Sequence, residues 1–186
     1  MSHRSCTSQT VTTMPNEISI LTQAPDTGGR RLTLTRSQDI AEISADMATR
    51  ARRELLIYGP TLDPVLYDQE PFLEAVRRLA LARPGFCVRV MLFDPRAASQ
   101  GGHRLIELAR RLTSRIAIQR VADEDRDRLD AFLIVDERRY VQRRLADRME
   151  AVADYDDPPA ARRLRQEFER LWERSSVDTE LRQLFI

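Results

Sequence analysis

Short apolar runs and amphipathic stretches follow one another along most of the chain. Residues 55–58, 86–93 and 131–135 form largely apolar runs of strand length, and residues 116–121 predict a further strand. Such runs are typical of strands that are buried on both faces of a sheet. Leu32 and Leu34 alternate with threonines, which indicates a short edge strand. We also expect residues 140–142 to extend the sheet as an antiparallel neighbour.

Between these strands, apolar residues recur at helical spacing. The helices that this spacing predicts are residues 37–53, 68–83, a stretch from about residue 101, and a long helix that begins at Pro158 and Pro159. Ser37 and Asp68 are the expected N-capping residues of the first two helices. Residues 177–185 keep the apolar spacing and predict a short final helix that either closes the core or contacts another subunit.

Strands that alternate with helices in this way predict a layered α/β/α domain with a mostly parallel central sheet. With 186 residues, of which 42% are apolar, the chain can bury one core of ordinary size. We therefore expect a single domain over residues 31–186. Residues 1–30 are rich in Ser, Thr, Gln, Pro and Gly, and we expect them to form a flexible tail.

Composition excludes several kinds of chemistry. Every basic residue is an arginine, so no lysine is present to form a Schiff base, to act as a general base or to complete a Walker-type phosphate loop. Histidine occurs only at His3 and His103. The 30 basic and 29 acidic residues leave a net charge of +1, which provides no global attraction for nucleic acid or an anionic membrane.

The two cysteines, Cys6 and Cys87, form neither a disulfide framework nor a metal-ligand set. This usage fits a reducing cytoplasm, and no motif predicts a cofactor or a metal ion. The chain lacks both the roughly 18 consecutive apolar residues that a membrane span needs and the apolar stretch of a secretory signal. We therefore expect a cytoplasmic protein.

One candidate anion site is the segment Gly101, Gly102, His103 and Arg104. At a helix N-terminus the free backbone N–H groups favour an anion, glycines permit a close approach, and an arginine adds a forked donor. His103 is expected to stay neutral there, because the positive end of the helix disfavours the imidazolium. The alternative, which we favour, is a glycine turn followed by a solvated helix start.

A second cluster consists of Asp63, Tyr67, Asp68 and Glu70, which follow the first buried strand. Open α/β sheets place ligands beyond the carboxyl ends of their strands, so these carboxylates are candidates for cation binding or acid–base chemistry. The structural alternative is again favoured. It assigns Asp63 to an Asp-Pro turn, Asp68 to a helix cap and Glu70 to the first helical turn.

Arginines are frequent between residues 138 and 174, where ten of them accompany eight acidic residues and leave a local charge of only +2. Aromatic side chains that could stack on bases are sparse in this region. The pattern therefore favours a salt-bridged, solvated surface over a nucleic-acid groove.

The order of elements and the segment Ala-Phe-Leu-Ile-Val-Asp-Glu at residues 131–137 resemble the phospholipase D superfamily. In that family the corresponding strand reads His-x-Lys-x-x-x-x-Asp and is followed by Gly-Ser-x-Asn. The resemblance extends over about residues 37–175. It implies a phospholipase D-like fold, and for the family it implies a phosphohistidine intermediate and a lysine that binds the phosphoryl group.

The residues that the family needs for this reaction are replaced. With Asp136 on the motif aspartate, Leu129 stands at the position of the nucleophilic histidine and Ala131 at that of the lysine. The Gly-Ser-x-Asn positions fall on residues 143–146, which read Arg-Arg-Leu-Ala. Only the aspartate remains, and a structural use for it is expected.

Residues 62–72 and 102–108 are similar to a group of uncharacterised bacterial phospholipase D-like domains, some of which are joined to a GNAT acetyltransferase. The resemblance implies a non-catalytic module that acts through a protein partner, a homodimer or an acetyltransferase, and that binds a small phosphorylated ligand near His103. Two alternatives stay open. One is an anion-binding or nucleic-acid-binding domain, and the other is a divergent hydrolase that uses His103 and the nearby carboxylates.

Overall fold

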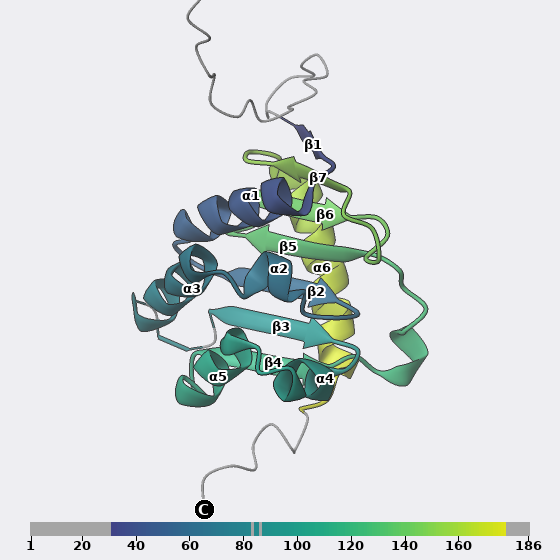
Figure 1. The fold of residues 1–186 in the computed structure, drawn as a ribbon. Helices are drawn as coiled ribbons and strands as arrows, with labels where there is room; N and C mark the ends of the chain where they lie inside the picture. Colours follow the sequence, from purple (N-terminus) through teal and green to yellow (C-terminus); the bar gives the residue numbers. More distant parts are fainter. Residues whose placement is uncertain (1–30, 83, 86, 178–186) are drawn as a thin grey trace, which may run out of the picture.

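Seven strands form one sheet in the order β1-β7-β6-β5-β2-β3-β4 (Figure 1). The structure is a computed structural model and describes residues 31–82, 84–85 and 87–177. The strands are β1 (Leu32–Leu34), β2 (Leu55–Gly59), β3 (Val88–Leu92), β4 (Ile116–Arg120), β5 (Ala131–Val135), β6 (Arg139–Arg143) and β7 (Ala151–Asp154). The predicted strands are therefore present, with β1 at the edge, while β7 was not predicted.

The sheet is mixed, not mostly parallel. β2 pairs in parallel with β3, and β3 with β4. The other four pairings, including β5 with β6 as predicted, are antiparallel. The layered α/β fold is confirmed, whereas the expectation of a mostly parallel sheet is wrong. The reason is that no helix connects β5, β6 and β7, and strands joined directly by turns or loops pair antiparallel.

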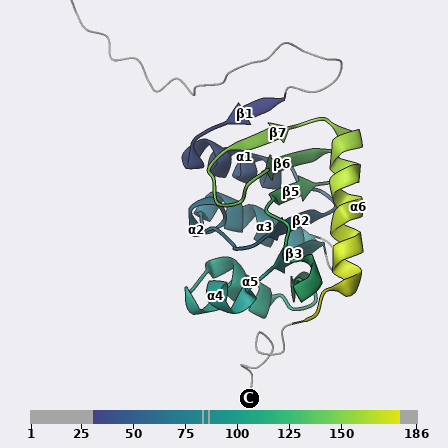
Figure 2. The same ribbon diagram turned by 90° about the vertical axis from the view of Figure 1, so that its right-hand side faces the viewer.

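Helices cover both faces of the sheet, as Figure 2 shows from the side. One face carries α1 (Ser37–Thr49), α2 (Pro64–Tyr67), α3 (Glu70–Ala82), α4 (Pro95–Gln100) and α5 (Arg104–Arg111). The opposite face carries α6 (Pro158–Arg174), and a 3₁₀ turn, η1 (Asp123–Asp125), lies in the connection before β5. No helix in the described part of the chain is long and apolar enough to cross a membrane.

Several predicted helix ends need correction. The first helix ends at Thr49, and Arg36 occupies its N-cap position while Ser37 is already helical. Asp68 does not cap the second long helix, because it ends the short helix α2 and turns its carboxylate to another partner. The predicted final helix at residues 177–185 lies outside the described residues beyond Val177.

Two apolar cores lie on the two faces of the sheet, because successive side chains of a strand point to opposite faces. In β2, Leu55 and Ile57 belong to the core under α1, α3 and α5, while Leu56 and Tyr58 belong to the core under α6. All four side chains are buried. The continuous apolar runs of the sequence therefore reflect burial on both faces, as predicted.

Asp136 fixes the turn that joins β5 to β6. Asp136 and Glu137 both have positive φ angles, of 55° and 54°, as the central residues of a tight hairpin turn require. The Asp136 carboxylate accepts three backbone N–H groups, from Arg52 (2.9 Å), Arg53 (2.7 Å) and Glu54 (3.0 Å). The motif aspartate thus ties the hairpin to the segment before β2, which is a structural use.

Leu79 and Leu81 provide a matched test of the core in α3. Leu79 is 3% exposed and Leu81 is 60% exposed. We expect Leu79→Ala to lower the free energy of unfolding by about 2–5 kcal/mol, since it leaves a cavity in the core. Leu81→Ala should change it by less than about 0.5 kcal/mol. Urea denaturation of both variants measures the difference, and equal losses would show that the face assignment of α3 is wrong.

Asp136→Asn tests the hairpin anchor. Asparagine tolerates a positive φ, so the variant removes the charge and one acceptor oxygen while the turn geometry stays accessible. We expect a loss of about 2–4 kcal/mol of unfolding free energy, because hydrogen bonds to a charged group are lost or weakened. Chemical denaturation measures it, with Asp147→Asn as a control at a position without a described hydrogen bond. A loss no larger than that of the control would contradict the anchoring role.

Candidate functional site

Leu129 and Ala131, which the resemblance aligns with the family's histidine and lysine, lie at the edge of the sheet where β2 and β3 end. β5 runs antiparallel to β2, so its first residue, Ala131, stands beside Gly59 at the end of β2. A Cβ atom on Gly59 would lie only 3.2 Å from that of Ala131, so the two strands meet closely here. Ala131 is buried, whereas Leu129, just before the strand, is 65% exposed.

An ion pair beside Ala131 occupies this end of the sheet. Arg143 is the cross-strand partner of Ala131, and its Nη2 donates to Oδ2 of Asp63 from the turn that follows β2. The Arg143 side chain is 3% exposed, and its Nη1 also lies 3.5 Å from the sulfur of Met149. A cation therefore lies near the position of the family's lysine, but a carboxylate neutralises it.

Both charges of this ion pair influence the pKa of Tyr67. Burial raises the pKa of Tyr67 to about 12, and the Asp63 carboxylate adds to this rise while the Arg143 guanidinium opposes it. The phenol is therefore protonated at neutral pH. It is too weak an acid to supply a nucleophile there.

The two candidate clusters of the sequence meet in space, and Arg104 joins them. Its Nε donates to Asp68 Oδ1 at 2.6 Å, its Nη1 to Glu70 Oε2 at 2.7 Å and its Nη2 to the Asp68 carbonyl at 2.6 Å. Two carboxylates thus surround the guanidinium of the candidate anion site. The predicted first-turn position of Glu70 in α3 is confirmed.

His103 caps the helix that it was expected to open. Its Nδ1 accepts the backbone N–H of Leu105 at 3.2 Å, and the residue is 2% exposed. Since Nδ1 accepts, the neutral ring carries its proton on Nε2, and that atom is buried without a described partner. Burial lowers the pKa of His103, and the nearby Asp68 carboxylate opposes this shift. The neutral imidazole was predicted, although burial and not the helix end is its main cause.

The glycines before His103 form the connection between two helices. Gly101 follows α4 as its C-cap residue, and Gly102 has a φ of 70°, which a residue with a side chain rarely adopts. The glycine turn that we favoured from the sequence is therefore present, whereas the expected solvated helix start is wrong for His103, which is buried because its ring caps the helix.

Arg143 is the site residue that the sequence did not single out. It was one of ten arginines in a stretch whose charges nearly cancel, and its burial becomes visible only when β6 is paired with β5. The sequence offered one signal for Arg143, which is that it aligns with the first residue of the replaced Gly-Ser-x-Asn motif.

This site offers few functional groups that could take part in a reaction. It offers carboxylates that are engaged with arginines, a protonated phenol and a buried neutral imidazole, but no exposed nucleophile at positions 129 and 131. In the described ranges of the chain, no group of three or more His, Cys, Asp or Glu residues could hold a metal ion.

Comparison with solved structures places this fold among phospholipase D-like folds. Nuc, a phospholipase D family member from Salmonella typhimurium, matches with a TM-score of 0.57 and 10% identity over 81% of this chain and 99% of that chain. TrmBL2, an archaeal chromatin protein with a novel mode of DNA binding, matches with a TM-score of 0.56 and 14% identity over 80% of this chain. The match spans about half of the TrmBL2 chain, at 54%.

Sequence comparison gives a family but no described activity. No curated protein matches the chain. A family model described as a domain of unknown function, DUF7931, matches residues 36–184, which include every strand from β2 to β7 and all of the helices. The chain therefore belongs to the DUF7931 family and has a phospholipase D-like fold.

Proposed function

We propose that this protein is a non-catalytic phospholipase D-like module that acts by binding. The observation that carries the proposal is the pair of aliphatic residues at the motif positions, with Leu129 exposed and Ala131 buried beside Gly59. Attack on phosphorus needs a nucleophile, and the phosphoryl oxygens need a free positive charge. Leucine and alanine provide neither, and a symmetric dimer would bring together two copies of the same strand.

Arg143 does not replace the missing lysine. Its guanidinium is buried and bound to Asp63, so a phosphoryl group could reach it only by displacing that carboxylate. To bind a substrate, Arg143 would first have to separate from Asp63. Breaking a buried ion pair costs several kcal/mol.

His103 is a poor candidate for a new catalytic base. One ring nitrogen accepts the Leu105 N–H and the other is buried. A general base must reach the proton that it removes, and a side chain that is 2% exposed cannot do so without local opening. These contacts support a helix-capping role and count against the divergent hydrolase.

Exposed leucines beside the former catalytic position support a protein partner. Leu129 is 65% exposed and Leu145 is 36% exposed. The segments that carry them are paired, because the carbonyl of Leu129 accepts the N–H of Ala146 at 2.7 Å. Apolar side chains that stay in water at one place favour contact with another protein, whether a second copy or an acetyltransferase.

Nucleic acid is the less favoured ligand. The similarity to TrmBL2 supports it only at the level of the fold, since the identity is 14%. Against it stands the pairing of the arginines with carboxylates, as in Arg128 with Asp130, Arg138 with Asp156 and Arg174 with Asp125. Paired guanidinium groups have little charge left for a phosphate backbone.

A hydrolysis assay on the full chain tests the proposal. We expect no release of product from bis-p-nitrophenyl phosphate, p-nitrophenyl phosphate or p-nitrophenyl acetate above a protein-free control, because Leu129 and Ala131 cannot attack and His103 is buried. An active phospholipase D family enzyme under the same conditions provides the positive control. Turnover near the usual enzymatic range of roughly 1 s⁻¹ or more, lost in His103→Ala, would contradict the proposal and restore the hydrolase.

The pH dependence of stability tests the role of His103. Above pH 6.5 the imidazole is neutral in both the folded and the unfolded chain. As the pH falls below 6.5, the unfolded chain binds a proton that buried His103 resists. Stability should therefore fall by up to about 1.4 kcal/mol per pH unit until the lowered pKa is reached.

The matched variant is His103→Asn, since asparagine also caps helices. Unfolding free energies at pH 7 and pH 5.5 should differ less in this variant than in the unmodified protein. An identical pH dependence in both proteins would show that His103 titrates normally and is accessible.

A further inference from the structure

A cavity of about 370 Å³ lies on the α6 face of the sheet, beside strands β6 and β7. It is bounded by the first turn of α6, by the residue before β1 and by the residue after β6. Ala131 and Arg143 belong to the other face, because they are cross-strand partners and Arg143 pairs with Asp63 at the start of α2. The cavity is therefore separate from the site described above.

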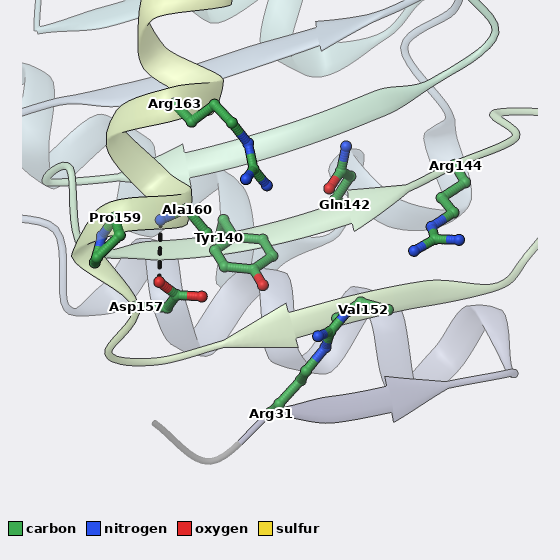
Figure 3. A pocket seen from close by; sticks show the side chains of 9 residues that line it. All are labelled: Arg31, Tyr140, Gln142, Arg144, Val152, Asp157, Pro159, Ala160 and Arg163. Atoms are coloured by element: carbon green, nitrogen blue, oxygen red, sulfur yellow. Dashed lines mark hydrogen bonds between the residues drawn. The ribbon is translucent and has the colours of Figure 1, made fainter. Parts of the chain in front are cut away.

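Three arginines from distant parts of the sequence line this cavity. Figure 3 shows the guanidinium groups of Arg31, Arg144 and Arg163 reaching toward the same space from the start of β1, the end of β6 and the first turns of α6. Burial raises the pKa of Tyr140, which also lines the cavity, and the positive charges of Arg31 and Arg163 oppose this rise. The sheet and the helix thus hold three cations around one hollow.

These arginines differ from most others in the chain because they lack carboxylate partners. None of Arg31, Arg144 and Arg163 forms an ion pair with another residue in the described ranges. By contrast, Arg165, one turn along α6 from Arg163, pairs with Glu54, Glu137 and Glu169. Like charges repel, so guanidinium groups that line one cavity without counter-charges gain stability from an anion between them.

The other polar groups of the lining favour a single compact anion. Gln142 and Tyr140 add neutral hydrogen-bonding groups beside the cations. Asp157 is the one carboxylate of the lining, and it is engaged as the N-cap of α6, where Oδ1 accepts the N–H of Ala160 at 3.0 Å. Three guanidinium groups and one carboxylate leave a charge of +2 in the lining. A phosphate monoester carries about −1.5 to −2 at pH 7 and matches it.

We propose that the cavity formed by Arg31, Arg144 and Arg163 on the α6 face binds the phosphate group of a small phosphate monoester. Arginine forks match phosphate oxygens in a bidentate geometry, and the volume is within the range of small-ligand sites. The inference goes beyond the proposed function. It holds whether or not the opposite face has any hydrolytic activity, because Leu129, Ala131 and Arg143 do not line the cavity, and Arg144 is the one residue of the replaced Gly-Ser-x-Asn positions that does.

A polyanion is the competing ligand, and the geometry disfavours it. A nucleic-acid backbone needs a row of free cations and aromatic platforms for its bases. Three arginines without described ion pairs line this one cavity and do not form a row along the surface, and Tyr140, which is 5% exposed, offers little ring surface for stacking.

Titration calorimetry on the full chain tests the proposal at constant ionic strength. The probes are inorganic phosphate and glycerol 3-phosphate, with glycerol as the uncharged comparator and a 20-base-pair DNA duplex as the polyanion. We expect saturable one-site binding of both phosphates and none of glycerol. The double variant Arg144→Gln, Arg163→Gln should bind at least about tenfold more weakly, since it loses charged donors.

Arg162→Gln is the matched control. It removes the same charge from the same helix, at an exposed position that does not line the cavity, and should change the affinity by less than about twofold. Thermal melting followed by circular dichroism verifies that each variant folds. If the double variant unfolds, Arg163→Gln alone replaces it in the binding test, because Arg163 is exposed. Absence of saturable phosphate binding, or equal weakening by Arg162→Gln, would overturn the proposal. Tighter binding of the duplex with a steep salt dependence would also overturn it, in favour of a nucleic-acid surface.

Discussion

The buried ion pair of Arg143 with Asp63 is the contact on which this end of the molecule depends. A guanidinium that is 3% exposed needs a counter-charge, because an unpaired buried charge costs several kcal/mol. The pair therefore holds the turn after β2 against the end of β6, next to Ala131. It also keeps the Arg143 guanidinium, the cross-strand neighbour of Ala131, bound to a carboxylate within the protein.

Strand β6 sends neighbouring residues to opposite faces, and their surroundings differ sharply. Arg143 points to the face of α1–α5 and is buried in its ion pair, while Gln142 and Arg144 belong to the cavity on the α6 face. That face carries one helix among the described residues (Figure 2). The cavity lies beside the first turn of this helix. The fold thus gives Arg143 a counter-charge on one face and leaves three arginines without described ion pairs at the cavity on the other.

Sequence reasoning identified the elements that have strong patterns. The run at residues 131–135 is β5, the antiparallel neighbour at 140–142 is β6, and Pro158 begins α6. It missed β7, whose four residues Ala151–Asp154 include only small or short apolar side chains and an aspartate, so neither length nor periodicity marks it. It also missed the mixed pairing, because apolar runs indicate burial on both faces but not strand direction.

The two polar sites differ in how far they could be predicted. The replacement of the motif histidine and lysine is readable from the letters alone, and the structure adds where those positions lie. The cavity was hidden, because Arg144 and Arg163 belong to a stretch whose total charge is near zero and Arg31 is more than a hundred residues away. Net charge sums over a segment, whereas ligand binding depends on which arginines lack partners, and only the folded arrangement shows that.

An experimental structure of the protein crystallised with phosphate would test most directly the claim that the inherited site is closed and anion recognition lies on the other face. We expect phosphate density between Arg31, Arg144 and Arg163, with Arg143 still bound to Asp63. Phosphate bound to Arg143 beside Ala131, with Asp63 displaced and the α6 face empty, would contradict it.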